Sequence, residues 1–189
     1  MKVKTFIFCV FAYFVLFSID LSARPIAKDA RYGTHMPALI TAVVNTTGPV
    51  LELGCGDFST PLLHAICSVK KRFLFTTESN RQWMNYFLDL ACDWHQFQHV
   101  PSFNSWDEIG SGLQWSVVFV DHAPKERRVM DIVRLRPYTE IFVVHDTEIA
   151  DYRFEPVFAT FKYKYVYKRY DITTTLVSDT IDVVALFKN

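Results

Sequence analysis

The most informative part of the chain is the sequence Val50-Leu51-Glu52-Leu53-Gly54-Cys55-Gly56-Asp57-Phe58-Ser59-Thr60-Pro61. Its first four residues are apolar apart from one glutamate, which is typical of a short strand buried inside a parallel sheet. The two glycines, Gly54 and Gly56, allow a tight turn and a close approach of the backbone to a ligand. Thr60 is predicted to cap a helix whose first residue is Pro61. A strand, a glycine turn and a helix start together predict a nucleotide-binding loop.

Two details indicate which kind of nucleotide this loop binds. The dinucleotide fingerprint requires a glycine at its sixth position, where this chain has Ser59, and it has no counterpart of Glu52. The segment from Glu52 to Gly56 instead resembles the E/D-x-G-x-G motif of class I S-adenosylmethionine (SAM) dependent methyltransferases. The usual third glycine of that family corresponds to Phe58 here, and the ending Phe58-Ser59-Thr60 is a variant that the family also contains. A glycine turn that binds no ligand is the alternative.

The resemblance implies a SAM cofactor and a set of residues around it. In the family the acidic residue braces the loop near the methionine end of the cofactor. A carboxylate at the end of the next strand accepts hydrogen bonds from the ribose hydroxyls, and Glu78, 22 residues after Gly56, is at this place. A solvated strand end is the alternative for Glu78. The predicted cofactor-binding residues are Glu52, Gly54, Cys55, Gly56, Ser59, Thr60, Glu78 and Asp121.

Strands and helices alternate along most of the chain. Strands are predicted at 50–53, 72–77, 97–100, 115–120 and 141–144, with helices at 36–45, from 60 onward, and at 80–92, 125–136 and 154–161. Further β segments are predicted at 163–170, 173–177 and 181–187. This order predicts an α/β fold with a doubly wound, mostly parallel sheet. The family resemblance implies seven strands, of which the last is antiparallel.

For two of these elements the sequence predicts which side faces the core. In the helix at 125–136, the side chains expected to face the core are Val129, Ile132, Val133 and Leu135, with the charged residues outside. Tyr163, Tyr165 and Tyr167 share one face of their strand, opposite a lysine-rich face. We expect this aromatic face to pack on the sheet. A surface that stacks against glycans or nucleic-acid bases is the alternative.

The composition is that of an ordinary globular domain. The 189 residues are 50% hydrophobic and 16% aromatic, so the chain can bury a substantial core. It contains 20 basic and 20 acidic residues, and this balance gives no strong signal for nucleic-acid binding. We therefore expect a single domain over residues 35–189, preceded by a linker at 24–34.

The first 23 residues are interpreted separately from this domain. Lys2 and Lys4 precede an apolar run of 15 residues, Thr5 to Ile19, and small residues follow up to Ala23. This order is typical of a secretory signal peptide cleaved after Ala23, since a bilayer-spanning helix needs about 20 apolar residues. The prediction is export to a periplasm, an endomembrane lumen or the medium. A short membrane anchor, with membrane association through residues 5–19, is the alternative.

Two polar clusters follow predicted strands whose carboxyl ends meet at the ligand-binding edge of such a sheet. They are Asp121-His122-Ala123-Pro124 and His145-Asp146-Thr147-Glu148. Asp121, Asp146 and Thr147 are predicted to hold one Mg²⁺, which would lower the pKa of a substrate hydroxyl. Catechol-type O-methyltransferases, which this pattern resembles, use comparable positions but have an Asp-Asn pair where this chain has Asp146-Thr147.

Catalysis without a metal requires a general base. His122 and His145 are the candidates because imidazole titrates near neutral pH, and a structural role is the alternative for each. Asp121 is the catalytic carboxylate beside them, and Lys125 is a further candidate for orienting or deprotonating the substrate. If the strand continues through His145, this histidine and Asp146 point to opposite faces, so at most one of them faces the pocket.

These observations predict a SAM-dependent methyltransferase, with SAM and, in its metal-dependent form, Mg²⁺ as cofactors. The acceptor is predicted to be an oxygen nucleophile of a small molecule or a glycan. A non-catalytic or degenerate nucleotide-binding domain that has kept the fold is the first alternative. An NAD-dependent oxidoreductase is the second, and Glu52 and Ser59 argue against it.

Overall fold

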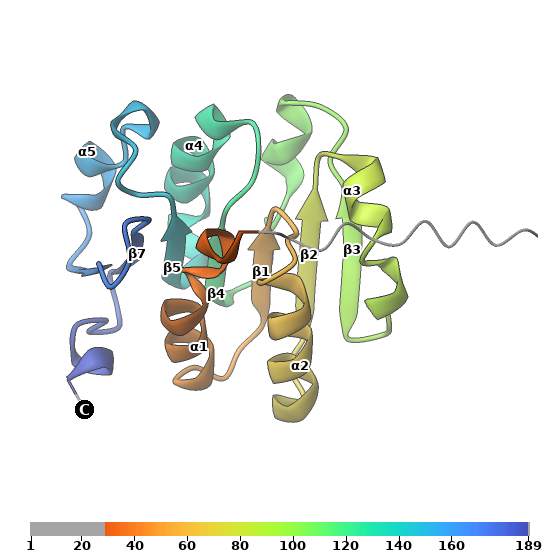
Figure 1. Ribbon diagram of the computed structural model, residues 1–189, viewed down its shortest axis with the longest axis horizontal. Helices are drawn as coiled ribbons and strands as arrows, with labels where there is room; N and C mark the ends of the chain where they lie inside the picture. The colour runs from red at the N-terminus through yellow and green to blue at the C-terminus, as the bar shows by residue number, and fades with distance from the viewer. Residues whose placement is uncertain (1–28, 189) are drawn as a thin grey trace, which may run out of the picture.

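The computed structural model describes residues 29–188, which form a seven-stranded sheet with the order β3-β2-β1-β4-β5-β7-β6 (Figure 1). The strands are β1 (Val50–Leu53), β2 (Leu74–Glu78), β3 (His95–His99), β4 (Trp115–Val120), β5 (Thr139–His145), β6 (Tyr163–Tyr167) and β7 (Thr174–Ser178). The first five strands pair in parallel, whereas β7 runs antiparallel to both β5 and β6. The predicted α/β class and the mostly parallel sheet are therefore confirmed.

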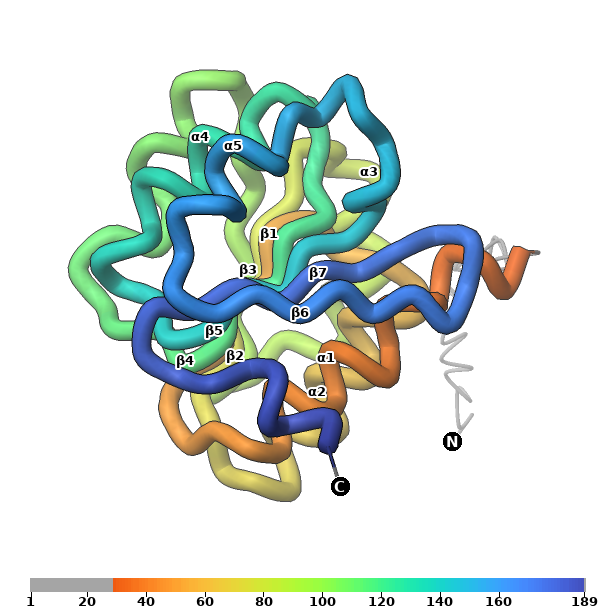
Figure 2. Tube along the Cα trace, turned by 90° about the vertical axis from the view of Figure 1, so that its left-hand side faces the viewer, coloured from red at the N-terminus to blue at the C-terminus, as the bar shows by residue number. Residues whose placement is uncertain are grey.

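Helices cover both faces of this sheet, as Figure 2 shows from the side of β6 and β7. The α-helices are α1 (Met36–Val44), α2 (Thr60–Lys70), α3 (Arg81–Asn85), α4 (Lys125–Leu135) and α5 (Glu155–Phe158). The 3₁₀ helices are η1 (Ala30–Gly33), η2 (Leu88–Leu90), η3 (Asn104–Glu108), η4 (Arg136–Tyr138), η5 (Ala150–Tyr152) and η6 (Ala185–Phe187). One core cluster joins α1, α2 and η6 to the sheet, and a second joins α4 and α5 to the opposite face.

The central strands are buried on both faces, which explains their continuous apolar sequences. In β4, Val117 and Phe119 face α1 and α2, while Val118 and Val120 face α4 and α5. In the parallel register Leu53 is level with Val120, and Val120 is level with Val144. The residues that follow β1, β4 and β5 therefore meet at one edge of the sheet.

Several predicted elements differ in the structure. The helix predicted at 154–161 is only α5, Glu155–Phe158, and the strand predicted at 163–170 ends at Tyr167. The helix predicted at 80–92 is shorter: α3 ends at Asn85, η2 follows it, and Cys92 instead forms a bridge with His95 at the start of β3. The strand predicted at 181–187 is wrong. The Ser178 hydroxyl accepts hydrogen bonds from the N–H groups of Thr180 and Ile181. These bonds turn the chain away from the sheet, so η6 packs against the core there instead.

The prediction of which α4 side chains face the core is also wrong in part. Val133 is 55% exposed, whereas Arg127, Arg128 and Asp131 are buried together with Ile132 and Leu135. The buried charges are tolerated because they pair with one another and with neighbouring elements. The tyrosines of β6 behave as expected: they pack against the core, and the Tyr165 ring stacks on Phe187 at 4.2 Å between centroids.

The N-terminal predictions are only partly within the described residues. The signal peptide or anchor at 1–23, including the apolar run at 5–19, lies outside them. Thr34, which the sequence assigned to the linker, is buried and hydrogen-bonds to His145. Within residues 29–188, no helix combines the length and the apolar character that crossing a bilayer requires.

Candidate functional site

The glycine loop leaves β1 against the end of β4. Gly54 has a φ of 90°, and a Cβ atom added there would lie 2.7 Å from the backbone oxygen of Asp121. Both the backbone angle and this contact therefore require glycine. Gly56 is less confined, since an added Cβ would meet only the Ser59 hydroxyl at 3.3 Å. The helix cap is displaced by one residue from the prediction, because Ser59 is the N-cap of α2 and Thr60 its first residue.

Glu52 braces this loop from behind. Its side chain is fully buried and accepts hydrogen bonds from the hydroxyls of Thr60 (3.0 Å) and Thr76 (2.8 Å). The Thr60 hydroxyl in turn accepts a bond from the N–H of Gly56 at 2.9 Å. Burial raises the pKa of Glu52 to about 7, despite the hydrogen bonds from Ser59, Thr76 and Thr60. The brace is thus a carboxyl group that changes charge near neutral pH.

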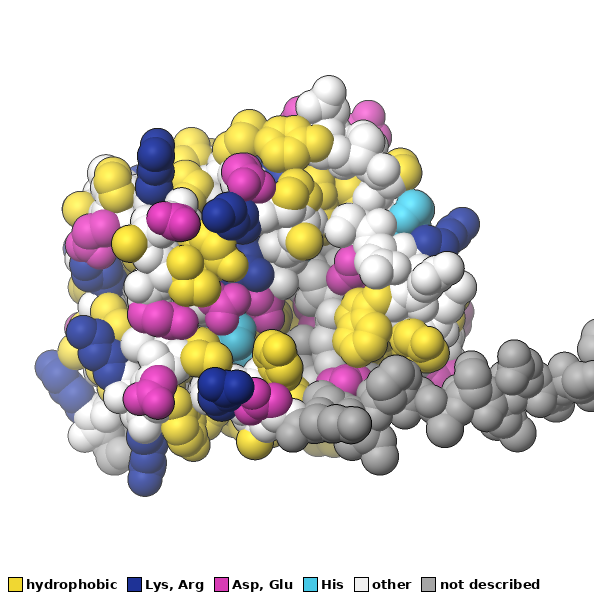
Figure 3. Space-filling view, turned by 45° about the horizontal axis from the view of Figure 1, so that its top comes forward, with side chains coloured by type: hydrophobic (Ala, Val, Ile, Leu, Met, Phe, Trp, Pro, Cys, Tyr) yellow, Lys and Arg dark blue, Asp and Glu magenta, His cyan; other side chains and the backbone are white. Residues whose placement is uncertain are grey.

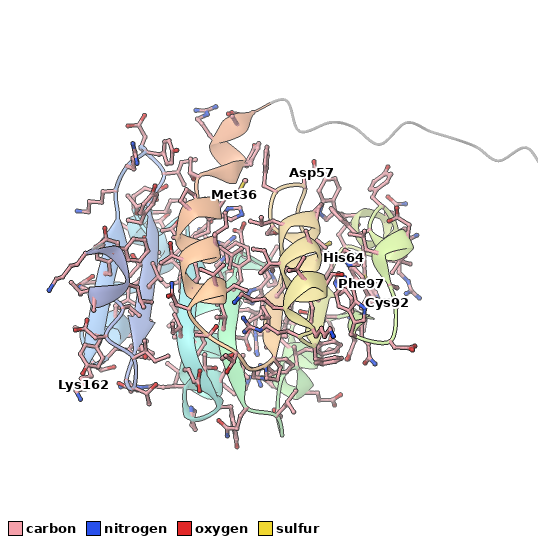
Figure 4. All side chains as sticks on the ribbon, turned by 90° about the horizontal axis from the view of Figure 1, so that it is seen from below. Met36, Asp57, His64, Cys92, Phe97 and Lys162 are labelled. Atoms are coloured by element: carbon pink, nitrogen blue, oxygen red, sulfur yellow. The ribbon has the colours of Figure 1, made fainter. Side chains whose placement is uncertain are left out.

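A chain of side chains connects Glu52 to α2. The Thr76 hydroxyl lies 3.0 Å from Nε2 of His95, and Nδ1 of His95 lies 2.9 Å from Nδ1 of His64. Figure 4 shows His64 on the side of α2 that faces Phe97 and Cys92. Burial lowers the pKa of His95 to about 4, so this ring is neutral at physiological pH.

Glu78 lies beside the loop, at the end of β2. One carboxylate oxygen accepts a bond from the N–H of Cys55 at 3.1 Å, and the other accepts from the N–H of Asn80 at 2.7 Å. The Trp83 indole donates to the Cys55 carbonyl at 2.8 Å, so both backbone groups of Cys55 are held by side chains. The Ser79 hydroxyl at 3.3 Å and the Cys55 thiol at 3.7 Å make longer bonds to the same Glu78 carboxylate. A ligand hydroxyl that replaced either of them would find an acceptor next to the loop.

Phe58, at the position of the usual third glycine, contacts the segment before α1. A Cβ added to Gly33 would lie 2.9 Å from the Phe58 ring and 3.3 Å from the Met36 sulfur. Figure 4 shows Met36 and Asp57 at the same end of α1 and α2. The departure from the glycine pattern therefore has a packing role: it joins the N-terminal segment to the loop.

The ends of β4 and β5 form a charged cluster, which we call the Asp121 cluster and define as Asp121, Arg128, His145 and Asp146. Arg128 reaches from α4 and donates to Asp121 at 2.9 Å and to Asp146 at 3.1 Å. Nδ1 of His145 lies 3.2 Å from Asp121 and 3.5 Å from Asp146. Figure 3 shows acidic and basic side chains gathered beside a histidine on this face of the molecule.

Asp121, His145 and Asp146 have shifted pKa values. Burial alone would raise the pKa of Asp121, but the hydrogen bond and charge of His145 lower it below the ordinary value. Burial alone would lower the pKa of His145, but Asp121 outweighs it and raises that pKa. Burial, followed by the charge of Asp121, raises the pKa of Asp146. The cluster thus contains an ion pair and a second, more basic carboxylate.

His145 and Asp146 face the same cluster, contrary to the alternation predicted for a continuing strand. β5 ends at His145, and Asp146 has a φ of 58°. This left-handed residue reverses the direction of its side chain, so the Asp146 carboxylate reaches Arg128 and His145. Positive φ is more accessible to aspartate than to most residues, but nothing in the local sequence pattern marks it here.

The three predicted Mg²⁺ ligands, Asp121, Asp146 and Thr147, do not form a magnesium site in the structure. The Arg128 guanidinium already lies between the carboxylates of Asp121 and Asp146. The Thr147 hydroxyl lies 2.8 Å from the hydroxyls of both Thr173 and Thr175, so it is engaged with β7. A Mg²⁺ ion requires an octahedral set of oxygen ligands, and an arginine in its place excludes that arrangement.

Two predicted catalytic residues lie apart from this cluster. His122 is 1% exposed, its ring lies tilted against Trp106 at 4.3 Å between centroids, and it bonds to Asp131 at 3.0 Å. These surroundings give His122 a structural role. Lys125 lies at the start of α4, where its half-exposed ammonium is 3.9 Å from the exposed Asp151.

Sequence reasoning missed Arg128, Thr34 and His35, which all contact the groups at the ends of β4 and β5. Arg128 appeared to belong to the solvent-facing side of an amphipathic helix. His35 is the N-cap of α1 but makes no capping hydrogen bond. Histidine is not a preferred N-cap residue, and this is the one sequence signal that could have marked the position.

The described residues have the class I methyltransferase-like fold. A putative O-methyltransferase from Klebsiella pneumoniae is similar, with a TM-score of 0.60, 16% identity, and coverage of 83% of this chain and 84% of that one. Cofactor-bound Rv0187 from MTB is similar with a TM-score of 0.60, 19% identity, and 84% coverage of each chain.

A third similar structure is the SAH-bound methyltransferase PaMTH1 from Podospora anserina. Its TM-score is 0.59 at 13% identity, and the match covers 76% of this chain and 77% of that one. No protein-family model matches this chain, and no curated protein matches its sequence. At these identities the similarity describes the fold, and function must be argued from the site.

Proposed function

We propose that this protein binds SAM at the glycine loop and transfers its methyl group. The observation that supports this most is the position of Glu78, whose carboxylate is held against the loop by the N–H of Cys55. A ribose diol needs acceptors beside the loop backbone, and Glu78 supplies them when the diol replaces the longer bonds from the Ser79 hydroxyl and the Cys55 thiol. Gly56 leaves room for a ligand, and Glu52 holds the loop through Thr60. The residues present therefore fit this cofactor.

For the reaction we propose an oxygen nucleophile of a small molecule or a sugar. The Asp121 cluster follows β4 and β5 at the same sheet edge as the loop. Asp121 and Asp146 keep 26% and 22% of their side chains exposed, whereas His145 is 3% exposed. Asp146, with its raised pKa, is the group best suited to accept a proton from a hydroxyl. His145 and Arg128 position the two carboxylates.

Isothermal titration with SAM, SAH and NAD tests the cofactor assignment. We expect SAM and SAH to bind and NAD not to bind. Glu78→Gln should weaken SAM binding about tenfold, since it removes a charged acceptor worth about 1.4 kcal/mol. Glu126→Gln is the matched control because that glutamate is exposed on α4. Folded protein that binds only NAD, or that loses SAM equally in both variants, would contradict the proposal.

A non-catalytic SAM-binding domain is the second candidate function. The observation that favours it is Phe58, which replaces the third glycine of the motif and packs toward Gly33. A screen of hydroxyl-bearing acceptors with methyl-labelled SAM separates the two candidates. Methyl transfer that is lost in Asp146→Asn, with SAM binding retained, supports catalysis. Tight binding without transfer to any acceptor supports the second candidate.

We also propose that residues 1–23 direct the chain to a membrane or through it. A signal peptide and a short anchor make different predictions for cells that express the full chain. Carbonate-resistant membrane association of the intact chain indicates an anchor, while a shortened, released product indicates cleavage after Ala23. Because SAM is made in the cytosol, an exported domain needs a supply of SAM in its compartment, and an anchored domain facing the cytosol does not.

A further inference from the structure

His35 is a buried imidazole without a hydrogen-bond partner. It is 2% exposed, and neither Nδ1 nor Nε2 has a partner among the described residues. A buried polar atom left unpaired costs about 1–3 kcal/mol, and this ring has two. A buried, unpaired ring nitrogen is explained if it binds a metal ion.

The ring lies against the Asp121 cluster. It is 4.7 Å from the His145 ring between centroids, in an edge-on orientation, and 4.7 Å from the Phe119 ring. One ligand atom each from His35, Asp121 and His145 can be chosen so that all three lie within 4.8 Å of one another. These residues come from the start of α1, the residue after β4 and the last residue of β5, so the sheet register brings them together.

The contacts around these ligands suit a bound cation. Arg128 donates to one oxygen of Asp121, Oδ1, and leaves Oδ2 directed at Nδ1 of His145. The Thr34 hydroxyl donates to the Arg31 carbonyl at 3.0 Å, so it accepts from Nε2–H of His145 at 3.1 Å. Nδ1 of His145 faces Asp121, and a bound cation would take the place of the proton between these two groups. Metal-binding histidines commonly donate their other N–H in this way.

We propose that His35, Asp121 and His145 form a binding site for a divalent transition-metal ion of the Zn²⁺ class. Two imidazoles and one carboxylate are a donor set that Zn²⁺ accepts, with a fourth position left for water or a ligand. Atoms bonded to one tetrahedral Zn²⁺ lie about 3.4 Å apart, so the ligands move inward by about 1 Å on binding. The ligands differ from those predicted for Mg²⁺, and the proposal does not depend on SAM binding.

The test is metal binding to the full chain after chelator treatment. Co²⁺ is titrated while its visible d–d absorption is followed, and Zn²⁺ then displaces it. We expect one ion per chain in the absence of SAM. His35→Phe should weaken Zn²⁺ binding at least tenfold while leaving the metal-free melting temperature unchanged or higher, because phenylalanine removes the unpaired nitrogens and keeps the contact with Phe119.

His64→Gln is the matched control, since His64 and His95 form another close histidine pair. It should retain the wild-type Co²⁺ spectrum and affinity. If His35→Phe does not fold, His35→Gln is measured in its place. Binding that is unchanged in the His35 variants, or that is lost only in His64→Gln, overturns the proposal. So does wild-type protein with a normal melting transition that binds neither ion.

Discussion

Glu52 in β1 and Asp131 in α4 are both fully buried carboxyl groups. The hydrogen-bond partners of Glu52 are uncharged, whereas those of Asp131 include charged guanidinium groups. Glu52 receives its hydrogen bonds from the hydroxyls of Thr60 and Thr76. Asp131 receives bonds from Arg127 at 2.7 Å, from Arg134 at 2.9 Å and from His122 at 3.0 Å. Hydroxyls supply hydrogen bonds without charge, whereas guanidinium groups supply both.

The pKa values differ accordingly. Burial raises the pKa of Glu52 to about 7, because its hydroxyl partners compensate only part of the lost hydration. Burial alone would also raise the pKa of Asp131, but the hydrogen bonds of His122 and Arg127 lower it below its ordinary value. Equal burial thus gives one carboxyl that titrates near neutral pH and one that stays ionised. The first lies behind the glycine loop, and the second anchors α4.

The largest effect should come from breaking the Asp131 network. In Asp131→Asn, Arg127 remains 1% exposed and loses its buried counter-ion. Removing one partner of a buried ion pair costs about 3–5 kcal/mol. We expect the free energy of unfolding to fall by this amount at pH 7, measured in urea with tryptophan fluorescence. A loss below about 1 kcal/mol would show that Arg127 finds full compensation in Asp107, its other partner.

Glu52 should give the next largest effect, and it should depend on pH. Its pKa is about 7 in the folded chain against an ordinary 4.5, so the folded state binds more protons between these values. The stabilisation is therefore present below pH 4.5 and is lost as pH rises through 7. A shift of this size corresponds to about 3 kcal/mol. Glu52→Gln removes the titration.

The measurement is the free energy of unfolding of wild type and Glu52→Gln at several pH values. The difference between the two isolates Glu52 from groups with the opposite dependence, such as His95 and His35, whose pKa values are lowered. We expect the variant to gain stability relative to wild type as pH rises. The exposed Glu126→Gln should follow wild type throughout. Parallel curves for wild type and Glu52→Gln would mean that folding does not shift the pKa of Glu52.

The comparison also shows what the sequence could predict. The apolar runs of β1, β4 and β5 predicted buried parallel strands, since burial on both faces leaves a continuous signal. The runs of β1, β4 and β5 located Glu52, Asp121 and His145 near strand ends, and the run of β2 located Glu78. Parallel pairing alone then brings residues after β4 and β5 together, even though they are far apart in sequence.

Side-chain pairing across elements was not predictable in the same way. A stripe of Arg127, Arg128 and Asp131 has the periodicity of a solvent-exposed helix face, and only the partners supplied by β4, β5 and η3 make its burial favourable. The place of His35 beside His145 likewise depends on a contact between α1 and β5, which no local pattern encodes. The φ of Asp146 is set by the end of β5, so its direction could not be read from strand alternation.

The smallest effect should come from an ion pair that has the same chemistry as Asp131 but little burial. Arg136 and Asp179 form two parallel hydrogen bonds of 2.7 and 2.9 Å, with side chains 31% and 39% exposed. Water and salt weaken such a pair, so Asp179→Asn should cost less than about 1 kcal/mol, falling further at high salt. The same urea unfolding measures it. A cost equal to that of Asp131→Asn would mean that partner charge alone, without burial, determines the energy of these carboxylates.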